Sequence, residues 1–496
     1  MLLQQLIKDL PLQAIGSTEI EISGLTSDSR KVRPGFLFMA EPGLTVDGHD
    51  YLNQARSAGA VAFLVEHSTV SDLTQIVAPS TRSLLGVLAA RFYHQPADQI
   101  RMIGITGTKG KTTTAFLLEH FLRSAGKASG LMGSVQFRAG ETIEQSGYTT
   151  LPAVELQAHL ARAVDLGCSH MVMEVSSHAL AQRRVGGIDF DTAIFTNLTH
   201  DHLDFHGTME NYLQAKTMLF QHLGNCESGR KGPKRAVINI DDPAAKQVIA
   251  SCAVPFYTFG LNAKAQVHAD DLELKLAETA FRFSWPGGTA KVELPLVGRF
   301  NVYNFLAAFT AGLAEGLAAE AMLRSVADFA GVPGRFQQIR CGQAFPVIVD
   351  YAHTEDSLRQ VLQTAREFTK GRLLLTFGCT GDRDRSKRPV MGKLAAELAD
   401  FVIITSDDPH SEKPEDIIRE VYAGIDPNCQ TVELQPDRAK AIDQLITMAK
   451  PGDTVILAGK GHERVQIFKD YQLPFADEIK ASECLQRLGY NQGKEV

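Results

Sequence analysis

Short apolar runs alternate with amphipathic stretches along most of the chain. Near the start, the runs at 35–40 (GFLFMA) and 60–66 (AVAFLVE) predict strands, and residues 51–59 between them predict a helix. Strands that alternate with helices are typical of α/β sheets. Pro96, inside a polar segment, indicates where this unit ends. We therefore expect a small N-terminal α/β domain at residues 1–98.

A second unit begins at Ile100, where a short buried strand, a glycine-rich loop and a helical stretch follow one another up to Gly126. Residues 256–297 carry strand-type alternation and a Gly-Gly turn, which predicts an antiparallel excursion. We expect a central domain at residues 99–331, built on a mostly parallel sheet of the phosphate-loop type. Its other apolar runs predict buried strands at 170–176, 192–197 and 235–240 and a helix at 304–317.

Strands and helices alternate again in the last third of the chain. This pattern predicts a doubly wound, Rossmann-like parallel sheet in a C-terminal domain, residues 332–496. Each strand runs into a polar loop, and ligands of such sheets lie beyond the carboxyl ends of the strands, so the loops point to one shared pocket. The strand segments are FPVIVDYA (345–352), RLLLTFG (372–378), FVIITS (401–406) and DTVILAG (453–459).

Composition and charge narrow the class of protein. With 44% hydrophobic and 22% charged residues, the 496-residue chain is typical of soluble globular proteins. A net charge of -7 disfavours nucleic acid as a partner. The seven cysteines include no Cys-x-x-Cys pair, which indicates a reducing compartment. The sequence has neither a secretory signal nor a run of about 18 apolar residues, so we expect a cytoplasmic protein without a membrane span.

The segment GITGTKGKTTT resembles a phosphate-binding loop without matching its usual spacing. The usual pattern has a glycine five positions before the Gly of the Gly-Lys-Thr run, where this chain has isoleucine. Gly107 and Gly110 nevertheless allow backbone amides to converge on phosphate oxygens. Lys111 supplies a cation for the β- and γ-phosphates, and the hydroxyl of Thr112 suits Mg²⁺. The strand before the loop and the helix after it favour a nucleotide site over a simple glycine turn.

Other polar residues follow buried strands. Glu174 ends an apolar strand, where a carboxylate must be paired or bind a metal. The segment FTNLTHDHLDFHG (195–207) holds three histidines and two aspartates, which fit a catalytic base cluster, a metal site or a solvated loop equally well. Mg²⁺ favours oxygen ligands such as Glu174, whereas a centre built from the histidines would suit a transition metal. Lys216 lies among apolar helix residues and, by itself, fits a lysine that reaches out to solvent.

Together these motifs resemble the Mur ligase family over essentially the whole chain, and most closely its members that add the third amino acid to the cytoplasmic peptidoglycan precursor. The loop matches the family's Gly-Thr-x-Gly-Lys-Thr-Thr form, with Lys109 where the family usually has asparagine. The resemblance implies that ATP activates a carboxylate of UDP-N-acetylmuramoyl-L-alanyl-D-glutamate as an acyl phosphate, which the amine of an amino acid attacks. Mg²⁺ and protein cations would offset the negative charge that gathers there. We expect these small molecules as partners of a monomer.

The resemblance also assigns roles at the nucleotide. The catalytic residues would be Lys111, Glu174, His202 and Lys216, and the magnesium ligands Thr112, Glu174, His202 and Lys216. Lys216 would react with CO₂ to give a carbamate, N6-carboxylysine, whose carboxylate-like group binds a second Mg²⁺. The positions implied for ATP are Gly107, Thr108, Lys109, Gly110, Lys111, Thr112, Thr113, Asn301, Asn304, Arg335 and Asp350.

Two further sets of residues match substrate contacts of the family. For the UDP-sugar dipeptide they are Ser27, Ser29, the turn at 43–48, Thr149, Thr150, Ser176, Gln182 and Arg184. After Thr149 and Thr150, Leu151 interrupts the family's Thr-Thr-Pro sequence. For the incoming amino acid they are Arg383, Asp407, Asp408, Pro409, His410, Gly459 and Glu463.

The identity of the amino acid rests on four of these residues. Members that use meso-2,6-diaminopimelate typically carry Asp-Asn-Pro-Arg, whereas this chain has Asp-Asp-Pro-His at 407–410. Histidine is a weaker partner than arginine for a distal carboxylate, and a second aspartate would suit a distal ammonium. The sequence favours diaminopimelate, with L-lysine or another diamino acid as the alternative. A folylpolyglutamate synthetase-like ligase and a non-ligating P-loop regulator are more remote alternatives.

Overall fold

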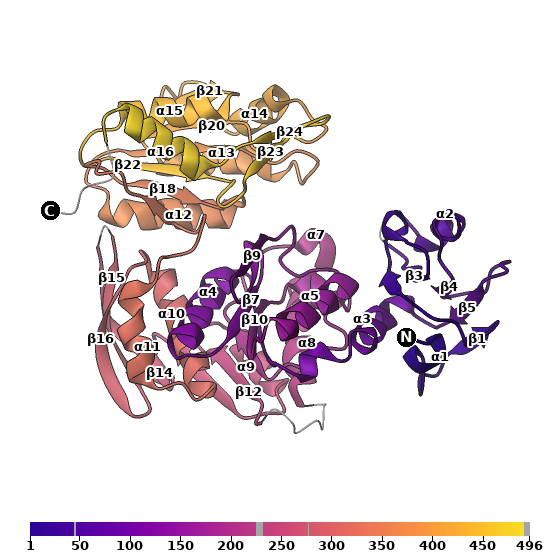
Figure 1. Ribbon diagram of the computed structural model, residues 1–496. Helices are drawn as coiled ribbons and strands as arrows, with labels where there is room; N and C mark the ends of the chain where they lie inside the picture. The colour runs from indigo at the N-terminus through magenta and orange to yellow at the C-terminus, as the bar shows by residue number, and fades with distance from the viewer. Residues whose placement is uncertain (44–45, 225–231, 276, 491–496) are drawn as a thin grey trace. The chain divides into compact units, whose positions relative to one another are not determined.

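The computed structural model describes residues 1–43, 46–224, 232–275 and 277–490, which form three large sheets with accompanying helices and a small two-stranded sheet (Figure 1). The chain divides into two compact units. The first comprises Met1–His268, Ser284–Gly287 and Tyr303–Ser325, and the second comprises Ala269–Phe283, Gly288–Val302 and Val326–Val496. Among the helices in the described ranges, none combines the length and the apolar character that a bilayer crossing requires.

The N-terminal sheet has five strands in the order β1-β5-β4-β3-β2. Strands β2 to β5 are parallel, and β1 runs antiparallel to β5. The two strands and the helix expected from the alternating pattern are confirmed as β3, β4 and α2. The elements are α1 (Leu3–Leu6), β1 (Gln13–Ile15), β2 (Gly24–Thr26), η1 (Ser29–Lys31), β3 (Phe36–Met39), η2 (Gly48–Tyr51), α2 (Leu52–Ser57), β4 (Ala62–Val65), β5 (Thr74–Val77), α3 (Thr81–Phe92) and η3 (Pro96–Asp98).

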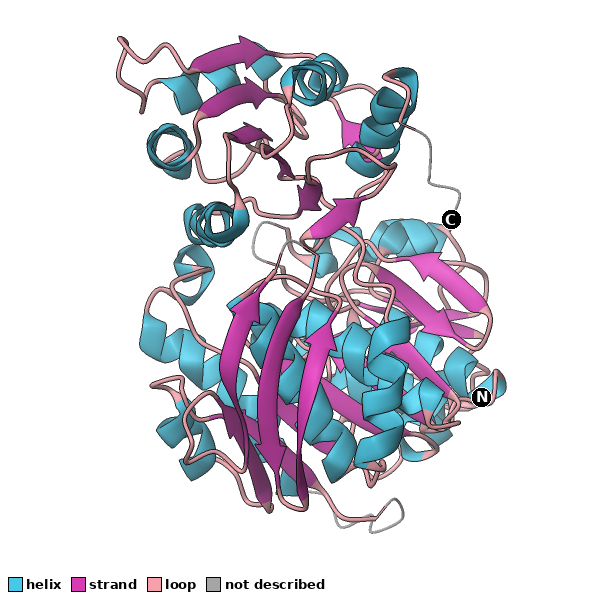
Figure 2. Ribbon diagram, turned by 90° about the vertical axis from the view of Figure 1, so that its left-hand side faces the viewer, coloured by secondary structure: helices cyan, strands magenta, loops and turns pink. Residues whose placement is uncertain are grey.

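The central sheet has eleven strands in the order β16-β15-β14-β13-β12-β11-β6-β10-β7-β8-β9. Strand β6 (Arg101–Thr106) lies between β10 (His170–Glu174) and β11 (Thr192–Phe195), and all three are parallel. Strands buried on both faces need apolar residues at nearly every position, which explains their unbroken apolar runs. The helices that belong to this part of the chain flank the sheet in Figure 2.

The strand expected at 235–240 and the helical stretch expected before Gly126 are confirmed as β12 and α4, and the helix expected at 304–317 spans Arg299–Ala314 as α10. The elements of this region besides β6, β10 and β11 include several that the sequence pattern did not predict. In chain order, these elements are α4 (Lys111–Ser124), β7 (Ser129–Met132), β8 (Gln136–Ala139), β9 (Thr142–Gln145), α5 (Ala153–Asp165), α6 (Ser177–Ala181), α7 (Leu203–His206), α8 (Met209–Gln221), η4 (His222–Gly224), β12 (Arg235–Asn239), α9 (Ala245–Ala250), β13 (Phe256–Gly260), β14 (Val267–Leu274), β15 (Thr279–Trp285), β16 (Gly288–Leu294), α10 (Arg299–Ala314), α11 (Ala319–Ser325) and η5 (Val326–Asp328).

The antiparallel excursion expected at residues 256–297 is wrong for its first part. Strand β13 pairs in parallel with β12, and β14 pairs in parallel with β13. The short helix α9 joins β12 to β13 and supplies the crossover that a parallel pair needs. Alternation along a strand reports which faces are buried and says nothing about the direction of the neighbouring strand, so the sequence pattern could not reveal this.

The C-terminal sheet has six strands in the order β17-β18-β22-β19-β20-β21. All are parallel except β17, which runs antiparallel to β18. Two apolar clusters lie on its faces, one with α12, α13 and α14 and the other with α15 and α16, which confirms the doubly wound arrangement.

The elements of this region begin at β17 (Gln337–Ile339). They continue with β18 (Val347–Asp350), α12 (Glu355–Phe368), β19 (Leu373–Phe377), α13 (Lys387–Leu398), β20 (Phe401–Thr405), α14 (Pro414–Tyr422), β21 (Val432–Gln435), α15 (Arg438–Met448), β22 (Thr454–Ala458), β23 (Val465–Ile467), β24 (Gln472–Pro474) and α16 (Asp477–Arg487). Because parallel strands end at the same edge, the loops after β18, β19, β20 and β22 leave from one side of the sheet.

A buried ion pair fixes that edge. Arg438 donates from Nε and Nη2 to the two carboxylate oxygens of Asp477, at 2.7 Å each, and both side chains are fully buried. The same guanidinium donates to the carbonyl of Ser406 at 3.3 Å and to that of Ala458 at 2.9 Å. Arg438 therefore joins the ends of β20 and β22 to helix α16.

Replacing Asp477 by asparagine should destabilise the second unit by about 3–5 kcal/mol, because it leaves the Arg438 charge buried without its counter-ion. Urea denaturation checks this. The matched control is Asp443→Asn, which breaks the more exposed pair between Asp443 and Arg487 and should cost less than about 1 kcal/mol. An equal loss of unfolding free energy in the two variants would contradict the stabilising role of the Arg438–Asp477 pair.

Candidate functional site

The glycine-rich loop joins β6 to α4, as the sequence predicts. Gly107 (φ +153°) and Gly110 (φ +84°) both have positive φ, and Gly110 caps the N-terminus of α4. A Cβ on Gly107 would lie 1.9 Å from Oγ1 of Thr196, and one on Gly110 would lie 2.3 Å from Oδ1 of Asn304. Both positions therefore require glycine. The loop presents backbone amides at a helix N-terminus, an arrangement suited to phosphate.

The end of β11 holds the loop in place. Asn197 accepts from the amide of Lys109 at 2.9 Å and donates from Nδ2 to its carbonyl at 3.1 Å. Thr196 donates from Oγ1 to the same carbonyl at 2.6 Å, and Thr108 donates its amide to the carbonyl of Asn197. The ammonium of Lys111 donates to the carbonyls of Gly107 and Thr108 at 2.8 Å each, so its charge lies at the loop itself.

Glu174 meets the loop from the neighbouring strand. Its side chain is 1% exposed, and its Oε2 accepts from the hydroxyl of Thr112 at 2.9 Å. Ser134 donates its amide to Oε1 at 2.8 Å and its hydroxyl to Oε2 at 3.3 Å. A hydroxyl and a carboxylate beside a phosphate loop offer the hard oxygen donors that Mg²⁺ prefers, so these residues fit a magnesium ion.

Hydrogen bonds link the Glu174 region to several of the residues expected at the dipeptide end of the UDP substrate. Thr149 bonds to the hydroxyl of Ser134 at 2.9 Å, and Thr150 donates to the carbonyl of Glu174 at 2.9 Å. Ser176 donates its amide to Oγ1 of Thr150 at 3.0 Å, and Arg184 donates to the carbonyl of Thr150 at 3.0 Å.

Gln182 ends helix α6, between Ser176 and Arg184 in the sequence. The structure thus joins the phosphate loop and Thr149, Thr150, Ser176 and Arg184 into one hydrogen-bonded network around Glu174.

Aromatic rings and histidines gather beside the loop. The ring of His178 lies 4.7 Å from that of His202 and 5.4 Å from that of His206, measured between centroids. The hydroxyl of Tyr212 bonds to Oγ1 of Thr108 at 3.1 Å. Burial, with the neighbouring histidines, lowers the pKa of His178 to about 4, and burial also lowers the pKa values of His202 and His206. The cluster is therefore neutral at physiological pH.

Lys216 is buried against this cluster, contrary to the interpretation of a lysine that reaches solvent. Its side chain is 1% exposed, and its Nζ lies 4.2 Å from the centroid of the Tyr212 ring. Within the described part of the chain, no carboxylate forms an ion pair with it. Burial, with the nearby charge of Lys111, lowers the pKa of Lys216 well below its ordinary value. Such a lysine favours the neutral amine.

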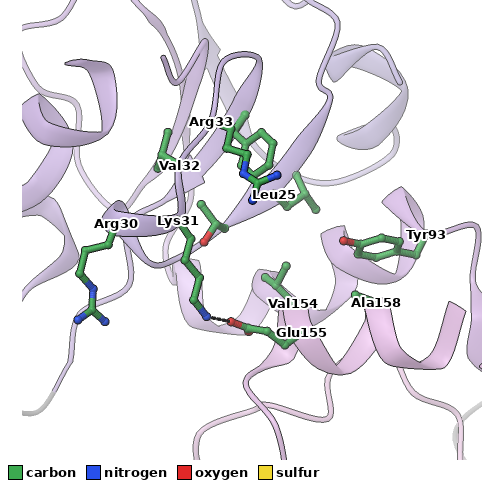
Figure 3. Close-up of a pocket in the computed structure, with 11 residues that line it drawn as sticks. Leu25, Arg30, Lys31, Val32, Arg33, Tyr93, Val154, Glu155 and Ala158 are labelled. Carbon is green, nitrogen blue, oxygen red and sulfur yellow. Dashed lines mark hydrogen bonds and ion pairs between the residues drawn. The ribbon is translucent and has the colours of Figure 1, made fainter. Parts of the chain in front are cut away.

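The N-terminal serines lie beside a pocket of about 410 Å³. Ser29 begins η1 and donates to Oε1 of Gln54 at 3.0 Å, while Ser27 lies just before it. The pocket opens between the residues that follow these serines and helix α5, where Lys31 forms an ion pair with Glu155 (Figure 3). Its basic residues are Arg30, Lys31 and Arg33 and its apolar ones include Leu25, Val32 and Val154. In the turn expected at 43–48, residues 44 and 45 lie outside the described residues.

The remaining residues expected at the nucleotide fall in both units. Asn304, in the first unit, lies against Gly110 and accepts from the hydroxyl of Thr114 at 3.5 Å. Asn301, Arg335 and Asp350 belong to the second unit. There Asn301 donates to the carbonyl of Val297, Asp350 accepts from the amide of Phe336, and Arg335 lies over the ring of Tyr351.

Three carboxylates and a buried cation occupy the edge of the C-terminal sheet. The oxygens of Asp407, Asp408 and Glu463 lie within 4.8 Å of one another. Lys460, with no exposed side-chain surface, donates to Asp408 at 2.7 Å and to Glu463 at 2.8 Å. Although burial opposes its charge, the three carboxylates raise the pKa of Lys460. Burial raises the pKa of Glu463, and Lys460 counteracts this. Gly459 (φ +111°) passes closely beside Asp407.

The remaining residues of the expected amino-acid site lie on the loops after β19 and β20. Pro409 is buried, and His410 (φ +50°) donates its amide to the carbonyl of Ile467. Arg383 is exposed on the loop after β19 and forms no ion pair with another described residue. The structure thus places Arg383, Asp407, Asp408, Pro409, His410, Gly459 and Glu463 on loops that leave one edge of one sheet.

Sequence reasoning missed four residues of these clusters: Ser134, Asn197, Tyr212 and Lys460. Asn197 and Lys460 had a signal, since each follows a buried strand within a segment that the sequence singled out. Ser134 and Tyr212 had none, because their proximity to Glu174 and Thr108 depends on how distant segments pack.

Comparisons with known proteins agree on one family. The description "Mur ligase family, catalytic domain" matches residues 21–93, "Mur ligase middle domain" matches 105–312, and "Mur ligase, glutamate ligase domain" matches 334–461. A relative from Syntrophomonas wolfei, the UDP-N-acetylmuramoyl-L-alanyl-D-glutamate--2,6-diaminopimelate ligase, is 43% identical over 98% of this chain and 99% of its own length.

Two solved structures are also similar. One, with the same name as that relative, has 33% identity and a TM-score of 0.70 over 99% of this chain and all of its own. The other, a folylpolyglutamate synthase of Mycobacterium tuberculosis, has 16% identity and a TM-score of 0.62 over 83% of this chain and 96% of its own. At that identity the second shows a shared fold alone.

Replacing Gly107 by alanine should weaken ADP binding by about tenfold or more, because the new Cβ overlaps Thr196 and strains the backbone. Isothermal titration calorimetry checks this. Gly126→Ala is the matched control, since Gly126 also has a positive φ but has open space around it. It should leave ADP affinity unchanged, and a normal affinity in the Gly107 variant would show that the loop does not hold the nucleotide.

Proposed function

The chain belongs to the Mur ligase family, and on that premise we propose that it joins meso-2,6-diaminopimelate to UDP-N-acetylmuramoyl-L-alanyl-D-glutamate with the consumption of ATP. The observation that supports this most is the network around Glu174. It links the phosphate loop to Thr149, Thr150, Ser176 and Arg184, so a phosphate donor and a carboxylate acceptor held at these two places would lie close together.

In the proposed reaction, the γ-phosphate of ATP passes to a carboxylate of the dipeptide and gives an acyl phosphate. The amine of diaminopimelate attacks the acyl carbon, and phosphate leaves. The chain contributes position and charge more than covalent chemistry. The amides from Gly107 to Thr113 and the ammonium of Lys111 hold the triphosphate, while Arg184 and the threonines orient the acceptor.

Magnesium fits this site, because Thr112 and Glu174 present oxygen donors beside the loop. We propose that these two residues, with His202, would hold magnesium, and that a modified Lys216 would hold a second Mg²⁺. When bound, Mg²⁺ supplies positive charge where phosphate and carboxylate oxygens approach each other. Partial burial lowers the pKa of His202, which favours the neutral ring that can act as a ligand.

Carbamylation of Lys216 follows from its surroundings. A neutral amine reacts with CO₂, and burial beside Lys111 favours the neutral form of Lys216. The carbamate carries a negative charge, so the modification replaces a buried amine, which has no carboxylate partner among the described residues, by an anion that can pair with a cation. The lowered pKa of Lys216 and its lack of a carboxylate partner among the described residues support this proposal.

The sugar nucleotide would be held by the first unit. We assign its uridine end to Ser27 and Ser29, next to the basic pocket, and its dipeptide end to Thr149, Thr150, Ser176, Gln182 and Arg184. We also propose three domains, at residues 1–98, 99–331 and 332–496, since each range has its own large sheet and its own family match. Asn304 would complete the ATP site of the first unit, and Asn301, Arg335 and Asp350 of the second unit remain predicted ATP contacts.

The diamino acid would bind at the edge of the C-terminal sheet, on Arg383, Asp407 to His410, Gly459 and Glu463. Asp408 argued for lysine as the substrate, because its charge would suit a distal ammonium. In the structure that charge is paired with buried Lys460, which leaves less of it for a substrate and supports diaminopimelate. We further propose that the protein is a cytoplasmic monomer whose partners are these small molecules.

Phosphate release decides between the ligase and its alternatives. The ligase should release phosphate from ATP only when the UDP-dipeptide and a diamino acid are both present, and mass spectrometry should show the UDP-tripeptide. Diaminopimelate, lysine and ornithine offered in parallel identify the amino acid. Release with ATP alone would indicate a P-loop regulator, and glutamylation of a folate in place of the UDP-dipeptide would indicate a folylpolyglutamate synthetase.

Replacing Lys216 by alanine should lower kcat for ligation by about 100-fold or more, because the site loses a charged group close to the reacting phosphate. A short carboxylic acid added to the buffer should restore part of the activity by taking the place of the carbamate. Lys246→Ala, at an exposed lysine of α9, is the matched control and should keep full activity. Full activity of the Lys216 variant in bicarbonate-free buffer would remove the carbamate from the mechanism.

A further inference from the structure

The predicted amino-acid-binding residues lie on two irregular loops that follow neighbouring strands. The loop after β19 carries Arg383, and the loop after β20 carries Asp408 and His410. We propose that Glu412 is a positioning residue that locks these two loops together and thereby sets Arg383 and His410 at the distance that the diamino acid requires. The inference rests on the proposed function, because it deepens the account of that same site.

A single carboxylate connects both loops to the body of the second unit. Oε1 of Glu412 accepts from the backbone amide of Asp382, next to Arg383, at 2.7 Å. Arg388 of α13 donates to the same carboxylate in a fork, from Nη2 to Oε1 at 2.7 Å and from Nη1 to Oε2 at 2.9 Å. Two parallel charge-assisted bonds fix direction as well as distance, so Glu412 has little freedom to move.

Further hydrogen bonds run between the loops themselves. Gly381 donates its amide to the carbonyl of Asp408 at 2.8 Å. Ser411 donates its amide and its hydroxyl to the carboxylate of Asp382, at 3.2 and 2.5 Å. A Cβ on Gly381 would lie 1.9 Å from the carbonyl oxygen of Pro409, so the two backbones are in direct contact. The loops therefore behave as one body.

The backbone at this contact needs such support. Asp382 (φ +55°) and His410 (φ +50°) both have left-handed backbone conformations. Residues other than glycine rarely adopt this conformation, and contacts with the surrounding structure are needed to maintain it. Each is adjacent to, or is itself, a predicted substrate contact. Without the Glu412 carboxylate, the amide of Asp382 loses its acceptor and the conformation that directs Arg383 loses a restraint.

The anchor behind Glu412 is rigid. Arg388 has no exposed side-chain surface, and it also donates to Glu420 of α14 at 2.8 Å and to the carbonyl of Thr380 at 3.3 Å. Hydrogen bonding to Arg388 lowers the pKa of Glu412 to about 2, so its charge persists at every physiological pH. Both carboxylate oxygens are engaged, which explains why Glu412 positions other residues, whereas exposed Arg383 remains available to the substrate.

Steady-state kinetics of Glu412→Gln test the proposal. Glutamine keeps the size but loses the charge and one acceptor, so KM for the diamino acid should rise by about tenfold while KM for ATP and for the UDP-dipeptide stays unchanged. Glu420→Gln is the matched control: Glu420 shares Arg388 and also accepts from the exposed side chain of Arg385, but it accepts no hydrogen bond from the backbone of either loop in the described structure. It should leave all three KM values unchanged.

Ser411→Ala provides a second test that does not threaten folding, because Ser411 is exposed. It removes one bond between the loops and should raise the same KM by a smaller factor. An unchanged KM for the diamino acid in both variants, or equal changes for all three substrates, would overturn the positioning role. Ligation of a diamino acid by the wild-type protein in the same assay separates the two ideas. If the wild-type protein is active, unchanged or equal KM values in the variants overturn the positioning role alone. If the wild-type protein is inactive, the proposed function itself fails.

Discussion

The first unit is organised around one buried carboxylate. Glu174 ends a central strand of the sheet with 1% of its side chain exposed, where an unpaired charge would cost several kcal/mol. Hydrogen bonds offset part of that cost, because the hydroxyl of Thr112 and the amide and hydroxyl of Ser134 all donate to its carboxylate. The same constraint draws the phosphate loop and Thr149–Thr150 to one point. In the proposed reaction, this is also where the phosphate and the acceptor carboxylate would meet.

The other buried lysine and arginine side chains of the described residues form ion pairs, and Lys216 differs from them. Arg438 has Asp477, Arg388 has Glu412 and Glu420, and Lys460 has Asp408 and Glu463. Lys216 is equally buried but rests on the ring of Tyr212, with no carboxylate partner among the described residues. A site that disfavours the ammonium form favours a reaction of the neutral amine, which is the physical basis of the proposed carbamate.

In the C-terminal sheet, the effect of having Asp408 in place of the asparagine of Asp-Asn-Pro-Arg depends on the residues that surround it. Read in the sequence, Asp408 adds a negative charge and favours a substrate with a distal ammonium. In the fold, the ammonium of Lys460 is paired with the Asp408 carboxylate. Glu412, on the same loop as Asp408, accepts a hydrogen bond from the loop that carries Arg383. The selectivity of such a pocket depends on the sum of charges and on the rigidity of the loops, and both are properties of several segments together.

The sequence by itself determined the α/β class, the strands and helices with the clearest apolar runs or periodicity, and the phosphate loop, because these depend on local patterns: apolar runs, and glycines between a strand and a helix. It also marked Glu174, Lys216 and the loops at the strand ends. Only the tertiary structure decided the parallel pairing of β13, the burial of Lys216, the places of Ser134, Tyr212 and Glu412, and the partners of Asn197 and Lys460. These depend on which segments lie side by side, and no pattern of neighbouring residues encodes contacts between segments that are distant in the chain.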